Sequence, residues 1–259
     1  MSESLVYAYG VARGARRPSL GRGSPRLPGG GVPRALPVSP RLWLVVADVP
    51  AADFQGEALD RRMHDVDWLS RCGVAHHGVI ARLGQQRAVV PFRVFTVFRT
   101  GERAVAGAAR RRRLLERTLD RVDGCREWVV RAAASPLAGD RGPRLEARSG
   151  TEYLLTRAAR RRSGPRPPSG ASRLVRALAS EASGIAKQVV RRRPAAEHGV
   201  LLDLALLVPR GREAALSRTL RRWTPRLAER GCRVWRTGPW PPYSFASAGR
   251  SSSRAGRRG

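Results

Sequence analysis

The side chains that most often bind metals or transfer protons are few in this chain of 259 residues. The four histidines are His64, His76, His77 and His198. His76 and His77 are adjacent, so on a helix their side chains point about 100° apart and cannot chelate one metal ion. His64 and Asp67 would share one helix face, and a solvated or partly buried polar pair is the favoured interpretation of that spacing.

No catalytic motif accompanies these residues, because the chain lacks H-E-x-x-H, G-x-S-x-G and phosphate-loop sequences. Acids on amphipathic helices usually face solvent or pair with nearby arginines. The acids considered for a catalytic pair are Asp60, Asp65, Asp67, Asp120 and Asp123. We therefore predict a protein that is not an enzyme and that uses no cofactor.

The three cysteines, Cys72, Cys125 and Cys232, are scattered and form no C-x-x-C pair. This spacing argues against a disulfide framework or a zinc module and indicates a reducing cytoplasm. The first residues do not form a signal peptide, and no apolar run reaches the roughly 18–20 residues of a membrane-spanning helix. We expect a cytoplasmic protein with no membrane span.

The charge is strongly basic, with 50 Lys and Arg against 20 Asp and Glu and a formal net charge of +30. Lys187 is the only lysine. A GC-rich coding bias explains arginine in place of lysine but not the excess over acids, so anionic partners are expected. The arginine clusters lie at 110–113, 160–162 and 191–193, with Arg250, Arg254, Arg257 and Arg258 near the end.

Nucleic-acid binding is the alternative function, because arginine clusters bind phosphates with release of counterions. Aromatic residues make up only 6% of the chain and do not interleave with the clusters as a base-stacking surface requires. Solvated helix faces are the favoured interpretation of these clusters.

Apolar periodicity predicts the secondary structure. The predicted strands are 5–11, 42–47, 89–98, 127–132, 201–208 and 233–237. The predicted helices are 53–83, 102–121, 151–162, 173–193 and 212–230. Asp53 is the expected N-cap of the first helix, which is either continuous or broken near Gly73. Pro91 indicates an edge or irregularity in its strand, and Pro225 should distort its helix.

Alternating strands and helices predict an α+β fold with two small α/β-sandwich-like domains of ferredoxin-like character, their sheets covered by helices. The expected domains are 1–125 and 126–246, followed by a disordered basic tail at 247–259. Residues 13–40, rich in Gly, Pro and Arg, predict a flexible loop inside the first domain.

Several motifs resemble the GvpL/GvpF family of gas vesicle proteins. In the first half these are Ala47, Trp68-Leu69, His76 and Pro91-Phe92-Arg93 followed by Thr96-Val97-Phe98; in the second half they are Glu127-Trp128, Gly150, Tyr153-Leu154 and the closing stretch from Thr237 to Phe245. Together they span residues 5–246. Phe95 stands where the family has a small residue, and Glu152 stands where it has alanine.

The resemblance implies a gas vesicle accessory protein that binds the small hydrophobic shell protein and helps vesicle nucleation or organisation. Its partners would be the shell protein and other gas vesicle accessory proteins, and its location the gas vesicle. Arg93 is expected to be a structural or ion-pairing residue beside Pro91, and Tyr153 to begin a helix. Trp240, Tyr243 and Phe245 are expected to pack back across the two domains along a rigid, extended path. A sheet surface or an inter-domain groove is the expected binding surface.

Overall fold

The computed structural model describes residues 3–20, 23–134, 170–192 and 199–246. These residues form two units, one of residues 1–124 together with the chain from Trp240 onward, and one of Cys125–Pro239. The sequence placed residues 240–246 in the second domain, whereas the structure groups them with the first unit. The predicted helix at 151–162, with Tyr153, and the predicted disordered tail at 247–259 lie outside the described residues.

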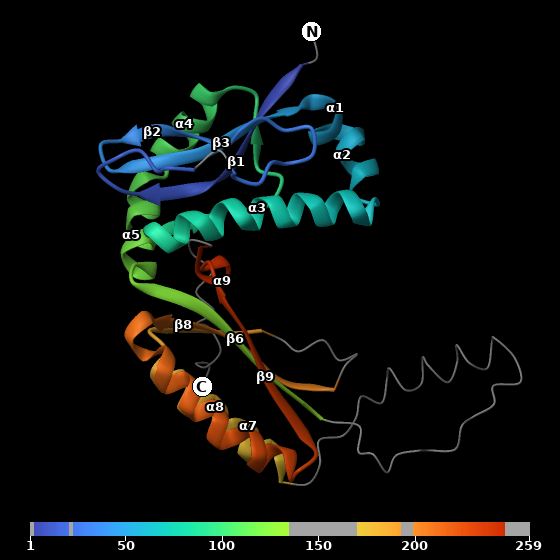
Figure 1. The fold of residues 1–259 in the computed structure, drawn as a ribbon, viewed down its shortest axis with the longest axis vertical. Coiled ribbons are helices and arrows are strands. Elements are labelled where there is room, and N and C mark those ends of the chain that lie inside the picture. Colours follow the sequence, from blue (N-terminus) through green and yellow to red (C-terminus); the bar gives the residue numbers. More distant parts are fainter. Residues whose placement is uncertain (1–2, 21–22, 135–169, 193–198, 247–259) are drawn as a thin grey trace, which may run out of the picture. The chain divides into compact units, whose positions relative to one another are not determined.

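Unit 1 is built on one antiparallel sheet (Figure 1). Its strands are β1 (Ser4–Arg13), β2 (Arg34–Ser39), β3 (Leu42–Pro50), β4 (Val89–Pro91) and β5 (Val97–Phe98). Its helices are α1 (Ala51–Phe54), α2 (Gly56–Arg62), α3 (Val66–Gln86), α4 (Gly101–Arg110), α5 (Arg112–Val122) and α9 (Tyr243–Ala246). The strand order is β2-β3-β1-β4, and β5 also pairs with β1.

Helices cover both faces of this sheet. Tyr7 and Tyr9 of β1 point to one face and pack in a core with Trp68, Val79 and other residues of α3. Helix α4 lies on the opposite face (Figure 1), and α4 and α5 together contact β1, β3 and β4. Because it is covered on both sides, β1 is buried along almost its whole length, as its continuous apolar sequence requires.

A bulge in β1 lets β4 approach closely. The register with β3 shifts between Ala8 and Gly10, and Gly10 pairs with Pro91. A Cβ atom on Gly10 would lie 2.4 Å from the Val90 carbonyl oxygen, so no larger residue fits there without a shift of the backbone. Glycine therefore fixes the position of Pro91 beside β1.

The structure corrects several predicted elements of unit 1. Part of the predicted loop at 13–40 is strand β2, an edge strand that tolerates Pro37 because its outer side needs no ladder hydrogen bond. Asp53 does not cap the long helix; Asp65 does, accepting a hydrogen bond from the Trp68 amide at 3.0 Å. Helix α3 then runs unbroken through Gly73.

The strand predicted at 89–98 is also interrupted, since residues 92–96 form a turn between β4 and β5. The helix predicted at 102–121 is divided at Arg111 into α4 and α5.

Unit 2 has a four-stranded sheet in the order β7-β8-β6-β9. Its elements are β6 (Cys125–Ala134), α7 (Ala171–Ile185), β7 (Gln188–Arg191), β8 (Val200–Pro209), the short 3₁₀ helix η2 (Arg210–Arg212), α8 (Glu213–Ala228) and β9 (Cys232–Trp240). The predicted helix at 173–193 is wrong beyond Ile185, because its last residues form β7. Pro225 lies inside α8 without ending it.

The two sheets have the same strand order. If the strands of each unit are numbered along the chain, their order across the sheet is 2-3-1-4 in both. In unit 2 the described elements follow the sequence β-α-β-β-α-β, which is the ferredoxin-like arrangement. In unit 1 no helix lies between β1 and β2 among described residues 14–20 and 23–33. Leu20 and Leu27 of that segment instead join the core beside α3. The predicted α+β class is confirmed.

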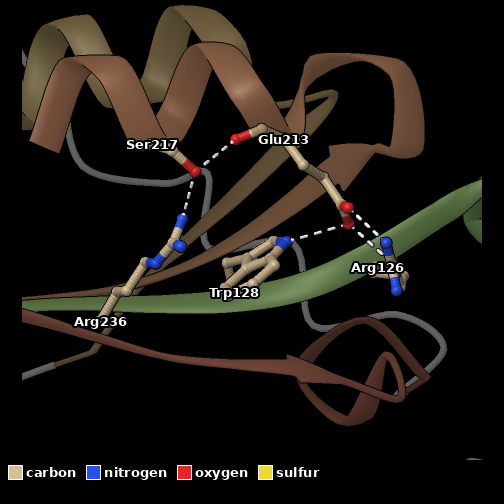
Figure 2. Close-up of polar contacts among 5 residues, drawn as sticks. All are labelled: Arg126, Trp128, Glu213, Ser217 and Arg236. Atoms are coloured by element: carbon tan, nitrogen blue, oxygen red, sulfur yellow. Dashed lines mark hydrogen bonds and ion pairs between the residues drawn. The ribbon is translucent and has the colours of Figure 1, made fainter.

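A polar cluster ties three elements of unit 2 together (Figure 2). The Arg126 guanidinium on β6 donates through Nε to Oε1 of Glu213 at 2.7 Å, and Nε1 of Trp128 donates to the same oxygen at 3.1 Å. Arg236 of β9 lies 4.6 Å over the Trp128 ring and donates to Ser217 Oγ at 2.6 Å. These contacts hold β9 against β6 and α8, and β9 is the strand that leads to Trp240.

Candidate partner-binding groove

An open groove of 1180 Å³ lies within unit 1. One wall is the chain from β4 to β5, another is formed by α4 and α5, and a third by α9. It is lined by Val90, Pro91, Phe92, Arg93, Val94, Thr96, Phe98, Gly107, Ala108, Arg110, Arg111, Leu114, Leu115, Tyr243 and Ala246. Most of these side chains are apolar, and the charged ones are all arginines. The groove therefore offers an apolar surface with a positive border.

The first wall is held rigid by main-chain hydrogen bonds. The Phe92 amide donates to the Tyr9 carbonyl at 2.8 Å, and the Ala8 amide donates to the Thr96 carbonyl at 2.8 Å. Thr96 closes the turn by donating through Oγ1 to the Arg93 carbonyl at 2.7 Å. The turn between β4 and β5 is thus anchored to β1 at both ends, so Phe92, Arg93 and Val94 line the groove from a fixed backbone.

Phe95 has a left-handed backbone at the tip of this turn, with φ of 64°. That conformation favours glycine, which explains why a small residue is expected at this position. The Phe95 ring stacks on the Trp68 ring, with centroids 5.5 Å apart and planes within 4°. The Phe95 amide also lies 3.4 Å from the Tyr7 hydroxyl, which accepts a hydrogen bond from it.

Arg93 lies exposed on the same wall. Among the described residues no carboxylate forms an ion pair with it, in contrast to Arg34 and Arg62, which pair with Asp48 at 2.6 Å and Asp53 at 2.8 Å. The Arg93 guanidinium is therefore open to an anionic group that enters the groove.

The third wall is the closing segment of the chain. Tyr243 lines the groove, and its hydroxyl lies 3.2 Å from Nδ1 of His77 on α3. The Trp240 ring meets the His77 ring edge to face at 5.3 Å, and Nη2 of Arg121 donates to the Phe245 carbonyl at 2.8 Å. Phe245 is buried and Trp240 is 37% exposed. The predicted extended path holds only as far as Trp240, where β9 ends, since residues 243–246 form the short helix α9.

A buried polar pair lies behind the groove, in the core between β1 and α3. The Tyr7 hydroxyl and Nδ1 of His76 are 2.7 Å apart. Burial lowers the pKa of His76 to about 4, with a smaller lowering from His77 and an opposing effect of the Phe92 backbone. Burial also raises the pKa values of Tyr7 and Tyr9. His76 is 1% exposed, so this pair belongs to the core and cannot reach a molecule bound in the groove.

The sequence profile described as "Gas vesicle synthesis protein GvpL/GvpF" matches residues 5–247. The chain belongs to the GvpL/GvpF family. The GvpL/GvpF match extends across both units, and the chain therefore has an accessory role in gas vesicles.

Two relatives in this family support the assignment. The chain is 37% identical over 235 residues to gas vesicle protein L of a Streptomyces species, with 84% of each chain covered. It is 30% identical over 206 residues to gas vesicle protein L2 of Halobacterium salinarum, covering 70% of this chain and 73% of the relative.

Crystal structures of GvpF share the fold. The protein from Anabaena gives a TM-score of 0.63 at 16% identity, covering 97% of this chain and all of that one. The protein from Microcystis aeruginosa gives 0.59 at 14% identity, covering 94% and 99%. At these identities the likeness concerns the fold alone.

The groove brings together three of the six expected structural or interaction residues, namely Pro91, Arg93 and Tyr243. Phe92, Thr96 and Phe98 of the same sequence motif also line it. Trp240 and Phe245 hold the third wall in place without lining the groove. Tyr153 and His198 lie outside the described residues. The sequence did not predict the wall formed by α4 and α5. The feature that could have indicated it is the arginine cluster at 110–113, which interrupts an otherwise amphipathic helix.

Two of the acids considered for a catalytic pair have structural contacts. Asp65 caps α3, and Asp120 pairs with Arg13 at 2.7 Å. His64 lies in the turn before α3, so it does not share a helix face with Asp67 as predicted. Cys72 and Cys232 are buried.

The described residues contain no group of three or more His, Cys, Asp or Glu side chains that could hold a metal ion. None of the described helices is long and apolar enough to span a membrane.

Proposed function

We propose that this GvpL/GvpF protein binds a segment of the small hydrophobic gas vesicle shell protein in the unit 1 groove, without chemical turnover, and thereby helps vesicle nucleation or organisation. The observation that carries the proposal is the meeting of Pro91, Arg93 and Tyr243 around one apolar groove. These residues come from the two stretches on which the family resemblance depends most, although about 150 residues of sequence separate them.

The size of the groove favours a protein segment over a small molecule. Pockets for small ligands enclose about 300–1,000 Å³ and bury most of the ligand surface. This groove measures 1180 Å³ and is open, so it fits the side of an amphipathic helix or an extended peptide. Apolar side chains exposed along such a groove lose contact with water when a partner covers them, and that loss drives binding.

The walls are suited to binding because they are preorganised. The β4–β5 turn is bonded to β1 at Phe92 and Thr96, and α9 is fixed to α3 and α5 through Tyr243 and Phe245. A groove that is already shaped before its partner arrives avoids part of the entropy cost of binding.

The experiment is an affinity pull-down of the co-expressed shell protein by the full-length chain. Val94 lines the groove and is 39% exposed, so Val94→Asp places a charge on the apolar surface with little effect on folding. We expect it to reduce the captured shell protein by about tenfold or more, from the cost of desolvating one carboxylate. The matched control is Val74→Asp, which alters a 68% exposed valine of α3 outside the groove.

Circular dichroism of each variant separates loss of binding from loss of folding. Retention of the shell protein by the folded Val94→Asp variant at the level of the Val74→Asp variant would place the binding surface elsewhere. Absence of capture by the folded wild-type chain would contradict shell-protein binding altogether.

A further inference from the structure

A second cavity continues from the groove at the junction of α4 and α5. It measures 490 Å³ and is lined by Val38, Ala109, Arg110, Arg111, Arg112, Arg113, Leu114 and Arg117. We refer to it as the arginine cleft. Helix α4 ends at Arg110 and α5 begins at Arg112, so the change of direction at Arg111 turns consecutive arginines toward one small volume.

These arginines are exposed and largely without acidic partners. Within the described part of the chain, Arg112 has a loose ion pair with Glu116 at 3.8 Å, and none is formed by Arg110, Arg111, Arg113 or Arg117. By contrast, a carboxylate lies within 3.0 Å of Arg13, Arg34, Arg62 and Arg131. What distinguishes the cleft is that five arginines line one cavity and four of them have no ion pair among the described residues.

The arrangement costs stability in the isolated protein. Arg113 and Arg117 lie four residues apart on α5, a spacing at which like charges repel by a few tenths of a kcal/mol. The first turn of α5 contains no acidic residue, so the positive end of the helix dipole adds to the same field. An anionic partner would relieve both effects, and this points to a binding role.

The cleft and the groove form one continuous surface, because Arg110, Arg111 and Leu114 line both. An elongated partner that seats an apolar face in the groove would therefore bring its adjoining residues to the arginine cleft. Carboxylates are the protein groups that arginine binds best, often through two parallel hydrogen bonds.

We propose that the arginine cleft receives the carboxylates of an acidic stretch that directly adjoins the apolar segment bound in the groove. The inference rests on the proposed function, since it concerns the same protein partner. The cleft selects segments with clustered Asp or Glu beside an apolar face and sets the direction in which they lie.

The lining favours an acidic protein segment over nucleic acid. The remaining lining residues, Val38, Ala109 and Leu114, are aliphatic, and none of the described residues of the cleft is aromatic. Binding of single-stranded nucleic acid relies on aromatic side chains that stack with bases, in addition to positive charge.

The test uses an array of overlapping 15-residue synthetic peptides covering the shell protein and the other gas vesicle proteins of the same organism. The full-length chain is applied to the array, and the bound peptides are then measured in solution by fluorescence anisotropy. The expected result is that bound peptides carry Asp or Glu beside an apolar stretch and lose affinity when those acids are changed to Asn or Gln.

The variant Arg111→Gln/Arg113→Gln/Arg117→Gln should weaken binding of these peptides by about tenfold at low salt, since exposed ion pairs contribute roughly 0.2–1 kcal/mol each. The difference should shrink as salt rises. The control is Arg99→Gln/Arg103→Gln/Arg218→Gln, which removes the same charge at exposed arginines outside both cavities.

Three results would overturn the proposal. They are equal weakening by the two triple variants, equal binding of acidic and neutralised peptides, and tighter cleft-dependent binding of a 20-nucleotide single-stranded DNA than of any peptide. Failure of the groove proposal can be told apart from failure of the cleft proposal. If only the groove proposal is wrong, Val94→Asp leaves peptide binding unchanged while the cleft variant still weakens it. An array that binds no peptide at all would also contradict the cleft proposal, whereas the pull-down of the shell protein decides the groove separately.

Discussion

The hydroxyl of Tyr243 and the Nδ1 atom of His77 lie 3.2 Å apart, although 166 residues separate them in the chain. This contact fastens the end of the chain to α3, and the Trp240 ring packs against the same imidazole. Tyr243 also lines the groove. A residue that closes one wall of the candidate binding surface is thus held by a histidine in the first half of the sequence.

Removal of the Tyr243 hydroxyl should loosen this wall without unfolding unit 1. Tyr243→Phe keeps the ring and removes one partly buried hydrogen bond, which contributes about 0.5–1.5 kcal/mol. We expect faster amide hydrogen exchange in residues 243–246 and a small drop in thermal midpoint. Unchanged exchange there would show that the Tyr243 hydroxyl does not contribute to holding α9.

The three aromatic residues of the closing segment should differ strongly in their contribution to stability. Phe245 is 2% exposed, and Phe→Ala changes at buried sites cost about 3–5 kcal/mol. Trp240 is 37% exposed, so Trp240→Ala should cost much less. Chemical denaturation of the full chain measures both. A larger cost for Trp240→Ala than for Phe245→Ala would contradict this ranking of the anchors.

The α+β class could be predicted because apolar periodicity marks the buried strands and the long amphipathic helix α3. Individual boundaries failed where tertiary contacts override local signals. Strand β2 was not predicted because its stretch is rich in Pro and Gly, but an edge strand tolerates Pro37. Gly73 does not break α3, since its position is open to solvent and costs only about 1 kcal/mol relative to alanine.

The candidate site was only partly predictable. Resemblance to the family singled out Pro91, Arg93 and Tyr243, but their meeting at one groove depends on the return of the chain to unit 1. The sequence did not predict that Leu114 lines the groove or that the arginines form a cleft, and the reason is different. The division of the predicted helix at Arg111 has no proline or glycine to mark it, so the arginines were interpreted as an ordinary solvated face.

Substitutions at Phe95 should separate backbone strain from side-chain packing. A left-handed backbone costs a residue with a Cβ atom roughly 1–2 kcal/mol, a cost that glycine does not have. Phe95→Ala keeps that cost and loses the stack on Trp68, whereas Phe95→Gly loses the stack and relieves the strain.

We therefore expect Phe95→Ala to be the less stable of these two variants by about 1 kcal/mol, with both less stable than wild type. Urea denaturation of the three proteins checks the order. If glycine and alanine gave equal stability, the left-handed conformation of Phe95 would not persist in solution.

Burial of His76 predicts a dependence of stability on pH. The pKa of His76 is lowered from 6.5 to about 4 in the folded chain, so the unfolded chain binds the proton more tightly. Stability from this residue is complete above pH 6.5 and is lost as the pH falls from 6.5 toward 4, by up to about 3 kcal/mol. Burial also lowers the pKa of His77, which adds a contribution of the same sign.

Denaturation midpoints measured between pH 4 and pH 8 test this dependence. His76→Gln removes the titrating group and should flatten most of the slope below pH 6.5, at the cost of some stability at pH 8. His64→Gln, at an exposed histidine in a turn, is the matched control and should retain the wild-type slope. A His76→Gln curve that parallels wild type would mean that other groups, and not the buried imidazole beside Tyr7, govern the acid sensitivity of unit 1.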